Sequence, residues 1–171
     1  MIHHINIQIT DRERTREWYE RVLGAEFLDR GPALNRRQLQ LRLGTGEIHT
    51  SDTEDLVKVP RVHFAIEVED FDSMLAHLDS QGVPYSRTGG GAFTGTGGDD
   101  PRQGTREDTG ERYTYISDPD ENLIELVYHA GGLENSSGEA VDLTHDTGNV
   151  RWTQIEGFVE AAYAEEQVTV S

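Results

Sequence analysis

Four side chains that can bind a divalent metal stand at matching places in two halves of the chain. His4 and His63 each open a run in which polar and apolar residues alternate, and His49 and Glu125 are each the third residue of a later strand. The chain has no cysteine, so a metal must be held by His, Asp or Glu. Any one of these histidines alone would be interpreted as a surface or core residue. Their matching positions instead favour a site for Fe, Mn, Ni, Zn or Co with open coordination positions.

Both halves predict the same order of elements: strand, helix and three further strands. In the first half these segments are strand 2–9, helix 12–23 and strands 25–30, 36–43 and 47–51. In the second half they are strand 62–69, helix 71–81 and strands 83–86, 113–117 and 123–128. Asp11 and Asp70 are expected N-caps, and Gly24 and Gly82 are expected helix terminators.

The fold class is therefore α+β, with two βαβββ modules over residues 1–52 and 60–130 that form a cupped mixed sheet. Each helix must cover the apolar face of its sheet, so the polar faces are left for solvent or for a cavity. If the modules face each other around a pseudo-twofold axis, the four candidate ligands converge. Histidines without such placement are expected at the surface, namely His3, His77, His129 and His145.

Two regions fall outside this repeat. Residues 88–110 are rich in glycine and almost free of apolar side chains, which predicts a mobile loop or a lid. Residues 131–171 predict a polar linker followed by an amphipathic helix with Trp152 and Phe158 on its apolar stripe. That helix is expected to cover a sheet edge of its own chain or to bind a partner subunit.

Composition narrows the possible partners and the location. The formal net charge is −17, and Lys58 is the single lysine among 15 basic residues. This acidity disfavours nucleic acid and anionic membranes, which bind through positive surfaces, and favours adaptation to high salt over an ordinary acidic cytosolic protein. No apolar run approaches the roughly 18 residues of a membrane span, and no signal peptide is recognisable, so a cytoplasmic protein is expected.

Several stretches resemble the vicinal oxygen chelate superfamily, which includes glyoxalase I, bleomycin-resistance proteins, extradiol dioxygenases, fosfomycin-resistance enzymes and methylmalonyl-CoA epimerase. They include H-I-N-I-Q-I-T-D at the start, the helix end V-L-G, and the closing S-D-P-D-E-N-L-I-E-L. The resemblance covers residues 1–129. It implies one divalent metal per site, with ligands at His4, His63 and Glu125. A fourth ligand position, commonly Glu or Gln in the family, is occupied here by His49.

The same resemblance implies a small oxygen-chelating substrate and a metal-dependent lyase or isomerase. A carboxylate must then move a proton, and Glu125 or Glu67 is the candidate base. Arg42, Gln40 and Tyr115 are candidate substrate contacts. The first alternative is an Fe(II)-dependent dioxygenase, in which Tyr115 or Tyr113 assists. The second is a resistance protein that binds or modifies a toxin. Modules of relatives pair within one chain or exchange between two, and a homodimer is expected.

Overall fold

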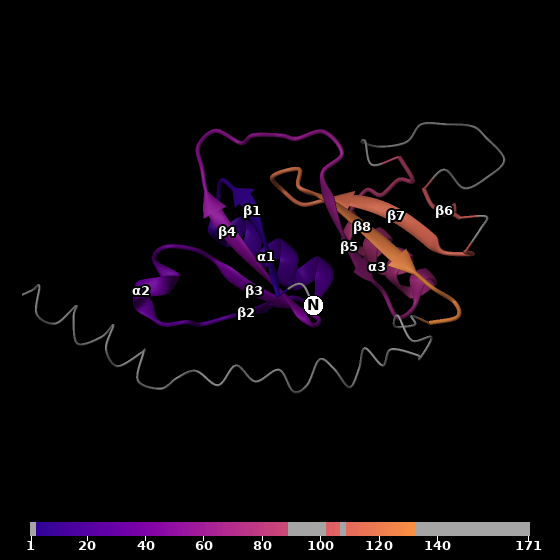
Figure 1. The fold of residues 1–171 in the computed structure, drawn as a ribbon, viewed down its shortest axis with the longest axis horizontal. Helices are drawn as coiled ribbons and strands as arrows, with labels where there is room; N and C mark the ends of the chain where they lie inside the picture. Colours follow the sequence, from indigo (N-terminus) through magenta and orange to yellow (C-terminus); the bar gives the residue numbers. More distant parts are fainter. Residues whose placement is uncertain (1–2, 89–101, 107–108, 133–171) are drawn as a thin grey trace, which may run out of the picture. The chain divides into compact units, whose positions relative to one another are not determined.

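Two βαβββ modules make up the part of the chain that the computed structural model describes, residues 3–88, 102–106 and 109–132 (Figure 1). The first module consists of β1 His4–Ile9, α1 Arg12–Leu23, β2 Glu26–Phe27, α2 Pro32–Asn35, β3 Gln40–Leu43 and β4 Gly46–Asp52. The second consists of β5 His63–Glu67, α3 Phe71–Gln81, β6 Gly104–Thr105, β7 Arg112–Ser117 and β8 Leu123–Tyr128. The C-terminal helix expected from the sequence lies outside the described residues, as does His145. Over the residues described, no helix combines the length and apolar character that a membrane crossing needs.

Each module forms its own four-stranded mixed sheet, and the first strand of the module lies at the sheet edge. The strand orders are β1-β4-β3-β2 and β5-β8-β7-β6. The edge strand runs parallel to the last strand of its module, which places His49 opposite Asn6 and Glu125 opposite Ala65. Each opposite residue is two positions beyond the histidine that opens the edge strand. The equivalence of His49 and Glu125 predicted from the sequence is therefore confirmed by the register.

The two main helices begin and end as the sequence predicts. The Asp11 and Asp70 carboxylates accept the backbone N–H groups of Arg14 (3.0 Å) and Ser73 (2.8 Å), which satisfies amides that the first turn leaves open. Both helices end at a left-handed glycine, where φ is 65° and 64°. The helices bury an apolar stripe in a shared core, which includes Trp18, Tyr19, Val22, Phe71, Leu75 and Leu78.

The expected strand over 83–86 is wrong. The segment makes one isolated bridge, between Ser86 and Tyr115, and the fourth strand of the second sheet is β6, from within the glycine-rich segment. A Cβ on Gly104 would lie 2.4 Å from the Tyr113 ring. Glycine at this position therefore permits the close approach of β6 to an aromatic ring, whereas composition alone indicated a loop.

The first module differs from expectation in smaller ways. The strand expected over 25–30 is only two residues long, and the strand expected over 36–43 begins at Gln40. The chain between them forms the short helix α2, with Pro32 at its first position. Proline is well suited there, because its fixed φ matches a helix and its missing N–H would be unpaired in the first turn.

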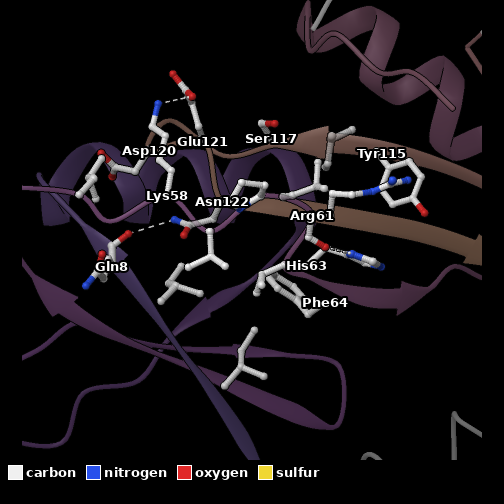
Figure 2. A pocket seen from close by; sticks show the side chains of 18 of the residues that line it. Gln8, Lys58, Arg61, His63, Phe64, Tyr115, Ser117, Asp120, Glu121 and Asn122 are labelled. Atoms are coloured by element: carbon white, nitrogen blue, oxygen red, sulfur yellow. Dashed lines mark hydrogen bonds and ion pairs between the residues drawn. The ribbon is translucent and has the colours of Figure 1, made fainter. Parts of the chain in front are cut away.

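The segment between the modules borders an open pocket of about 1120 Å³ (Figure 2). Val57, Val59 and Val62 line it and are the large apolar side chains that the described residues leave exposed. Lys58 forms an ion pair with Glu121 beside them. His63 and Tyr115 also line this pocket, so it reaches the polar face of the second sheet.

The turn between β7 and β8 fixes the second module against the first. Asp118 accepts hydrogen bonds from the Tyr19 hydroxyl (3.1 Å), the Asn122 side chain (2.8 Å) and two backbone amides of its own turn. The Asn122 amide also donates to the Gln8 carbonyl at 3.0 Å. Burial raises the pKa of Tyr19, and the neighbouring Asp118 charge adds to that shift. Burial also raises the pKa of Asp118, against the lowering effect of its hydrogen bonds.

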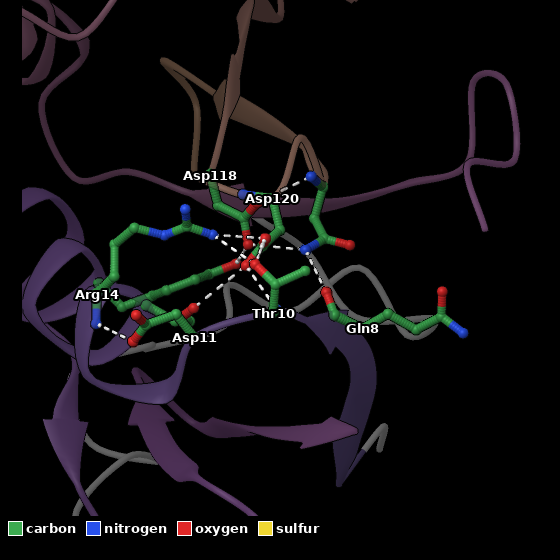
Figure 3. Close-up of polar contacts among 9 residues, drawn as sticks. Gln8, Thr10, Asp11, Arg14, Asp118 and Asp120 are labelled. Carbon is green, nitrogen blue, oxygen red and sulfur yellow. Dashed lines mark hydrogen bonds and ion pairs between the residues drawn. The ribbon is translucent and has the colours of Figure 1, made fainter. Parts of the chain in front are cut away.

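Asp120 forms the second connection of this turn to the first module (Figure 3). Its carboxylate accepts from the Thr10 hydroxyl at 2.6 Å and from Arg14 at 2.6 Å, while its side chain is 2% exposed. Burial alone would raise the pKa of Asp120, but the Thr10 hydrogen bonds and the Arg14 charge outweigh it and lower the pKa. The carboxylate is therefore ionised and paired at neutral pH.

We expect Asp120→Asn to lower the free energy of unfolding by about 1–3 kcal/mol, because it leaves the Arg14 and Thr10 donors with a weaker acceptor. The matched control is Glu121→Gln in the same turn, whose ion pair with Lys58 is exposed and contributes at most about 1 kcal/mol. Urea unfolding of both variants measures the difference. Equal stabilities of the two variants would contradict the role of Asp120.

Candidate metal centre

His63 and Glu125 form a pair on the polar face of the second sheet. The His63 Nδ1 lies 2.9 Å from the Arg61 carbonyl oxygen, which can only accept, so Nδ1 carries the proton. The other ring nitrogen, Nε2, lies 3.1 Å from Oε2 of Glu125. Metal-binding histidines are commonly oriented by an N–H donated to a backbone carbonyl, and Nε2 is then the nitrogen that could bind a metal.

The Glu125 carboxylate is buried and held through its other oxygen. Oε1 accepts from the Tyr115 hydroxyl at 2.9 Å and from Arg106 at 3.1 Å. Burial raises the pKa of Tyr115 to about 12, helped by the hydrogen bond to Glu125, so the phenol remains a proton donor at neutral pH. Both donors act on Oε1, which leaves Oε2 as the atom directed toward His63.

The spacing of the His63–Glu125 pair fits a divalent metal. Two ligands bound at about 2.1 Å and at right angles to each other lie about 3.0 Å apart. The 3.1 Å between Nε2 and Oε2 is close to that value. One imidazole and one carboxylate are also donors that Fe, Mn, Ni, Zn and Co accept.

The first sheet carries a corresponding group of histidines. The rings of His4 and His49 are stacked, with centroids 4.1 Å apart and planes 9° apart. Nδ1 of His4 lies 2.8 Å from Nδ1 of His3. His3 is half-buried, so its expected placement at the surface is wrong. The sequence set His3 apart because it neighbours His4 and so has the opposite parity in the predicted strand.

Glu47, which the sequence did not single out, lies within this group. Its buried carboxylate binds His49 Nε2 through Oε2 (3.0 Å) and Arg30 through Oε1 (2.7 Å). Burial would raise the pKa of Glu47, but the hydrogen bond with His49 and the Arg30 charge outweigh it and lower the pKa. A usable signal existed, since Glu47 has the same strand parity as His49 and therefore faces the same side.

The predicted substrate contacts of the first module lie beside these residues. Gln40 is the strand partner of His49 and is buried, while Arg42 is the strand partner of Glu47 and is exposed. The register thus puts both side chains on the polar face.

The four predicted ligands are placed as two pairs, His4 with His49 and His63 with Glu125. Across the residues that the structure describes, no group of three or more His, Asp or Glu side chains is arranged to hold a metal. The second pair has the spacing of metal ligands, whereas stacked rings in nearly parallel planes do not direct their nitrogens to one point. Each module thus holds one pair of the predicted ligands.

Glu67, the second candidate base, is bound to His129. Its carboxylate accepts from the backbone N–H and from Nδ1 of His129, each at 2.9 Å, and His129 Nε2 lies 3.0 Å from Glu111. The hydrogen bond with Glu67 and the two carboxylate charges raise the pKa of His129. The sequence predicted surface positions for His129 and His77, but both are half-buried and have specific partners. The His77 ring contacts the Val22 carbonyl at 3.1 Å.

The raised pKa of His129 makes a pH-dependent contribution to stability. A folded-state pKa above the unfolded value stabilises the fold fully below about 6.5, and this contribution is lost as pH rises through the folded pKa. We therefore expect the stability difference between the wild type and His129→Gln to be larger at pH 5.5 than at pH 9. Urea unfolding across this range measures it, and a difference that grows toward high pH would contradict the assignment.

Comparison with known proteins agrees with this fold. Residues 1–126 match the model of the Glyoxalase/Bleomycin resistance protein/Dioxygenase superfamily. The chain belongs to that superfamily, which confirms the resemblance found in its sequence. No curated protein matches the chain.

Solved structures of this fold are similar over most of their length. A glyoxalase family protein from Bacillus anthracis is 22% identical with a TM-score of 0.60, over 75% of this chain and 94% of that one. A glyoxalase family protein from Enterococcus faecalis is 26% identical with a TM-score of 0.54, over 74% and 96%. The fosfomycin resistance protein FosX from Listeria monocytogenes is 15% identical with a TM-score of 0.56, over 76% and 93%.

Proposed function

We propose that this protein is a metal-dependent enzyme that acts on a small oxygen-chelating substrate, as a lyase or an isomerase. The observation that carries the proposal is the His63–Glu125 pair, in which a nitrogen and an oxygen lie 3.1 Å apart and His63 lines a pocket. A bound divalent metal would act there as a Lewis acid toward adjacent substrate oxygens.

The chain's own residues would bind the substrate and move its proton. Glu125 and Glu67 remain the two candidate bases. Glu125 lies beside His63 at the proposed metal position, whereas both oxygens of Glu67 are bound by His129. Tyr115 donates to Glu125 and borders the pocket, so it can orient the carboxylate, and its oxygen can accept a hydrogen bond from the substrate. Arg42 and Gln40 would contact the substrate from the first sheet.

Two other functions fit the same superfamily. An Fe(II) dioxygenase would use the same residues, and a resistance protein is suggested by the fold shared with FosX. Metal analysis of protein purified without an affinity tag distinguishes the lyase or isomerase from the dioxygenase. Iron favours oxygen chemistry, whereas nickel, zinc or cobalt favours proton transfer. Oxygen uptake with catechols, isomerisation of a methylglyoxal–thiol adduct, and a stoichiometric antibiotic complex without turnover then discriminate among the three functions.

The complete site would form between two chains. Within the described part of one chain the predicted ligands occur as separate pairs. The strands that begin with His4 and His63 are both sheet edges, and no described strand pairs with their outer side. The exposed Val57, Val59 and Val62 lie near these edges, in the pocket wall. Unpaired edges and exposed valines are surfaces that a second copy can cover. We therefore propose a homodimer in which the first module of one chain, through His49, meets His63 and Glu125 of the other.

We expect His63→Ala and Glu125→Gln each to weaken divalent metal binding by at least about 100-fold, because loss of a ligand exceeds the cost of losing a supporting group. The control is His77→Gln, which changes a histidine outside both pairs. Zn²⁺ titration of the apoprotein measures affinity independently of activity. Full occupancy in His63→Ala would contradict the site.

Mixed dimers test the exchange between chains. Neither His49→Ala nor His63→Ala alone should hold metal tightly, but a mixed dimer regains one intact site from the unaltered modules. After unfolding and refolding together in equal amounts, about a quarter of the original sites should return, since half of the dimers are mixed. No recovery, with dimers present, would show that each site forms within one chain.

A further inference from the structure

The two modules contain the same arrangement of an arginine, a glutamate and a histidine. In the second module, Arg106 binds Oε1 of Glu125 and His63 Nε2 lies 3.1 Å from Oε2. In the first module, Arg30 binds Oε1 of Glu47 and His49 Nε2 lies 3.0 Å from Oε2. The same atoms meet in the same order, and both carboxylates are buried, with side chains 7% and 6% exposed.

We propose that Glu47 is a metal ligand that acts together with His49, as Glu125 acts together with His63. This inference rests on the metal-dependent function proposed above and adds a residue to its site. Glu47 lies two residues before His49 on β4, so it is not at the strand position that corresponds to Glu125. The equivalence is therefore one of side-chain geometry and not of sequence register.

The spacing of the Glu47–His49 pair satisfies the same requirement as that of the second module. Its 3.0 Å separation equals the distance between two ligands that bind one metal at about 2.1 Å and at right angles. His4 does not offer this geometry with His49. An imidazole binds a metal in its own ring plane, and the two rings are stacked 4.1 Å apart in nearly parallel planes.

Arg30 stabilises the buried Glu47 carboxylate of the first module when no metal is bound. Its guanidinium lies 2.7 Å from Oε1, which compensates the Glu47 charge and holds the carboxylate in place. Oε2 remains directed at His49. A site with carboxylates from both chains is more strongly negative, so it prefers a divalent cation with affinity for both oxygen and nitrogen, such as Mn²⁺, Fe²⁺ or Zn²⁺.

The test compares Zn²⁺ affinities of apoprotein carrying Glu47→Gln, Glu125→Gln or Glu26→Gln. Glu26 is an exposed glutamate on β2 and serves as the matched control. We expect Glu47→Gln to weaken binding at least about 10-fold and Glu26→Gln to leave it unchanged. An unchanged affinity in Glu47→Gln beside a large loss in Glu125→Gln would overturn the role of Glu47 alone. Unchanged affinity in both would instead overturn the proposed function.

A second measurement separates a ligand from a residue that only orients His49. In ¹⁵N NMR of histidine-labelled protein, Zn²⁺ should bind Nε2 of His49, the atom that faces Glu47. Binding through Nδ1, with the proton retained on Nε2, would make Glu47 a hydrogen-bond acceptor and overturn its assignment as a ligand. Circular dichroism of each apoprotein variant establishes that the fold is retained in the comparison.

Discussion

The parallel pairing of the first and last strands in each module is the constraint on which both parts of the candidate site depend. Parallel neighbours need a long crossover, and here the helix and the two middle strands of the module provide it. The helix covers one face of the sheet with apolar side chains, and the other face remains polar. The register then places His49 beside β1 and Glu125 beside β5. A shift by one residue would turn these side chains into the core.

Buried glutamates hold the polar side chains on both sheet faces in place. Each has one oxygen held by an arginine and the other in contact with a histidine nitrogen, and in our proposal a metal would bind between that second oxygen and the nitrogen. The same principle of paired burial operates in the turn between β7 and β8. There, Asp118 and Asp120 hold the second module to the first through Tyr19, Thr10 and Arg14. Glu47, Glu125, Asp118 and Asp120 therefore differ from the exposed acidic residues, because each is buried and has specific hydrogen-bonding partners.

Much of the fold followed from local patterns. Alternation and caps predicted the bounds of α1, the opening strand and helix of each module and the equivalence of His49 with Glu125, because each depends on residues near in sequence. The strand β6 was missed because a glycine-rich segment shows no strand pattern. The role of Gly104 becomes clear only from its contact with the Tyr113 ring on β7. Glu47 could have been found, because it has the same strand parity as His49. Arg106 was missed because its partner Glu125 comes from another segment. The pairing of His129 with Glu67 and Glu111 was missed for the same reason.

The decisive question is whether one metal joins residues from both modules. Anomalous scattering from crystals of protein loaded with Zn²⁺ or Mn²⁺ answers it. The expected result is one peak per chain, about 2.0–2.2 Å from His63 Nε2 and Glu125 Oε2 and equally close to His49 of a second chain. A peak bound only by residues of one module, or no peak beside Glu125, would contradict a metal centre shared between two chains.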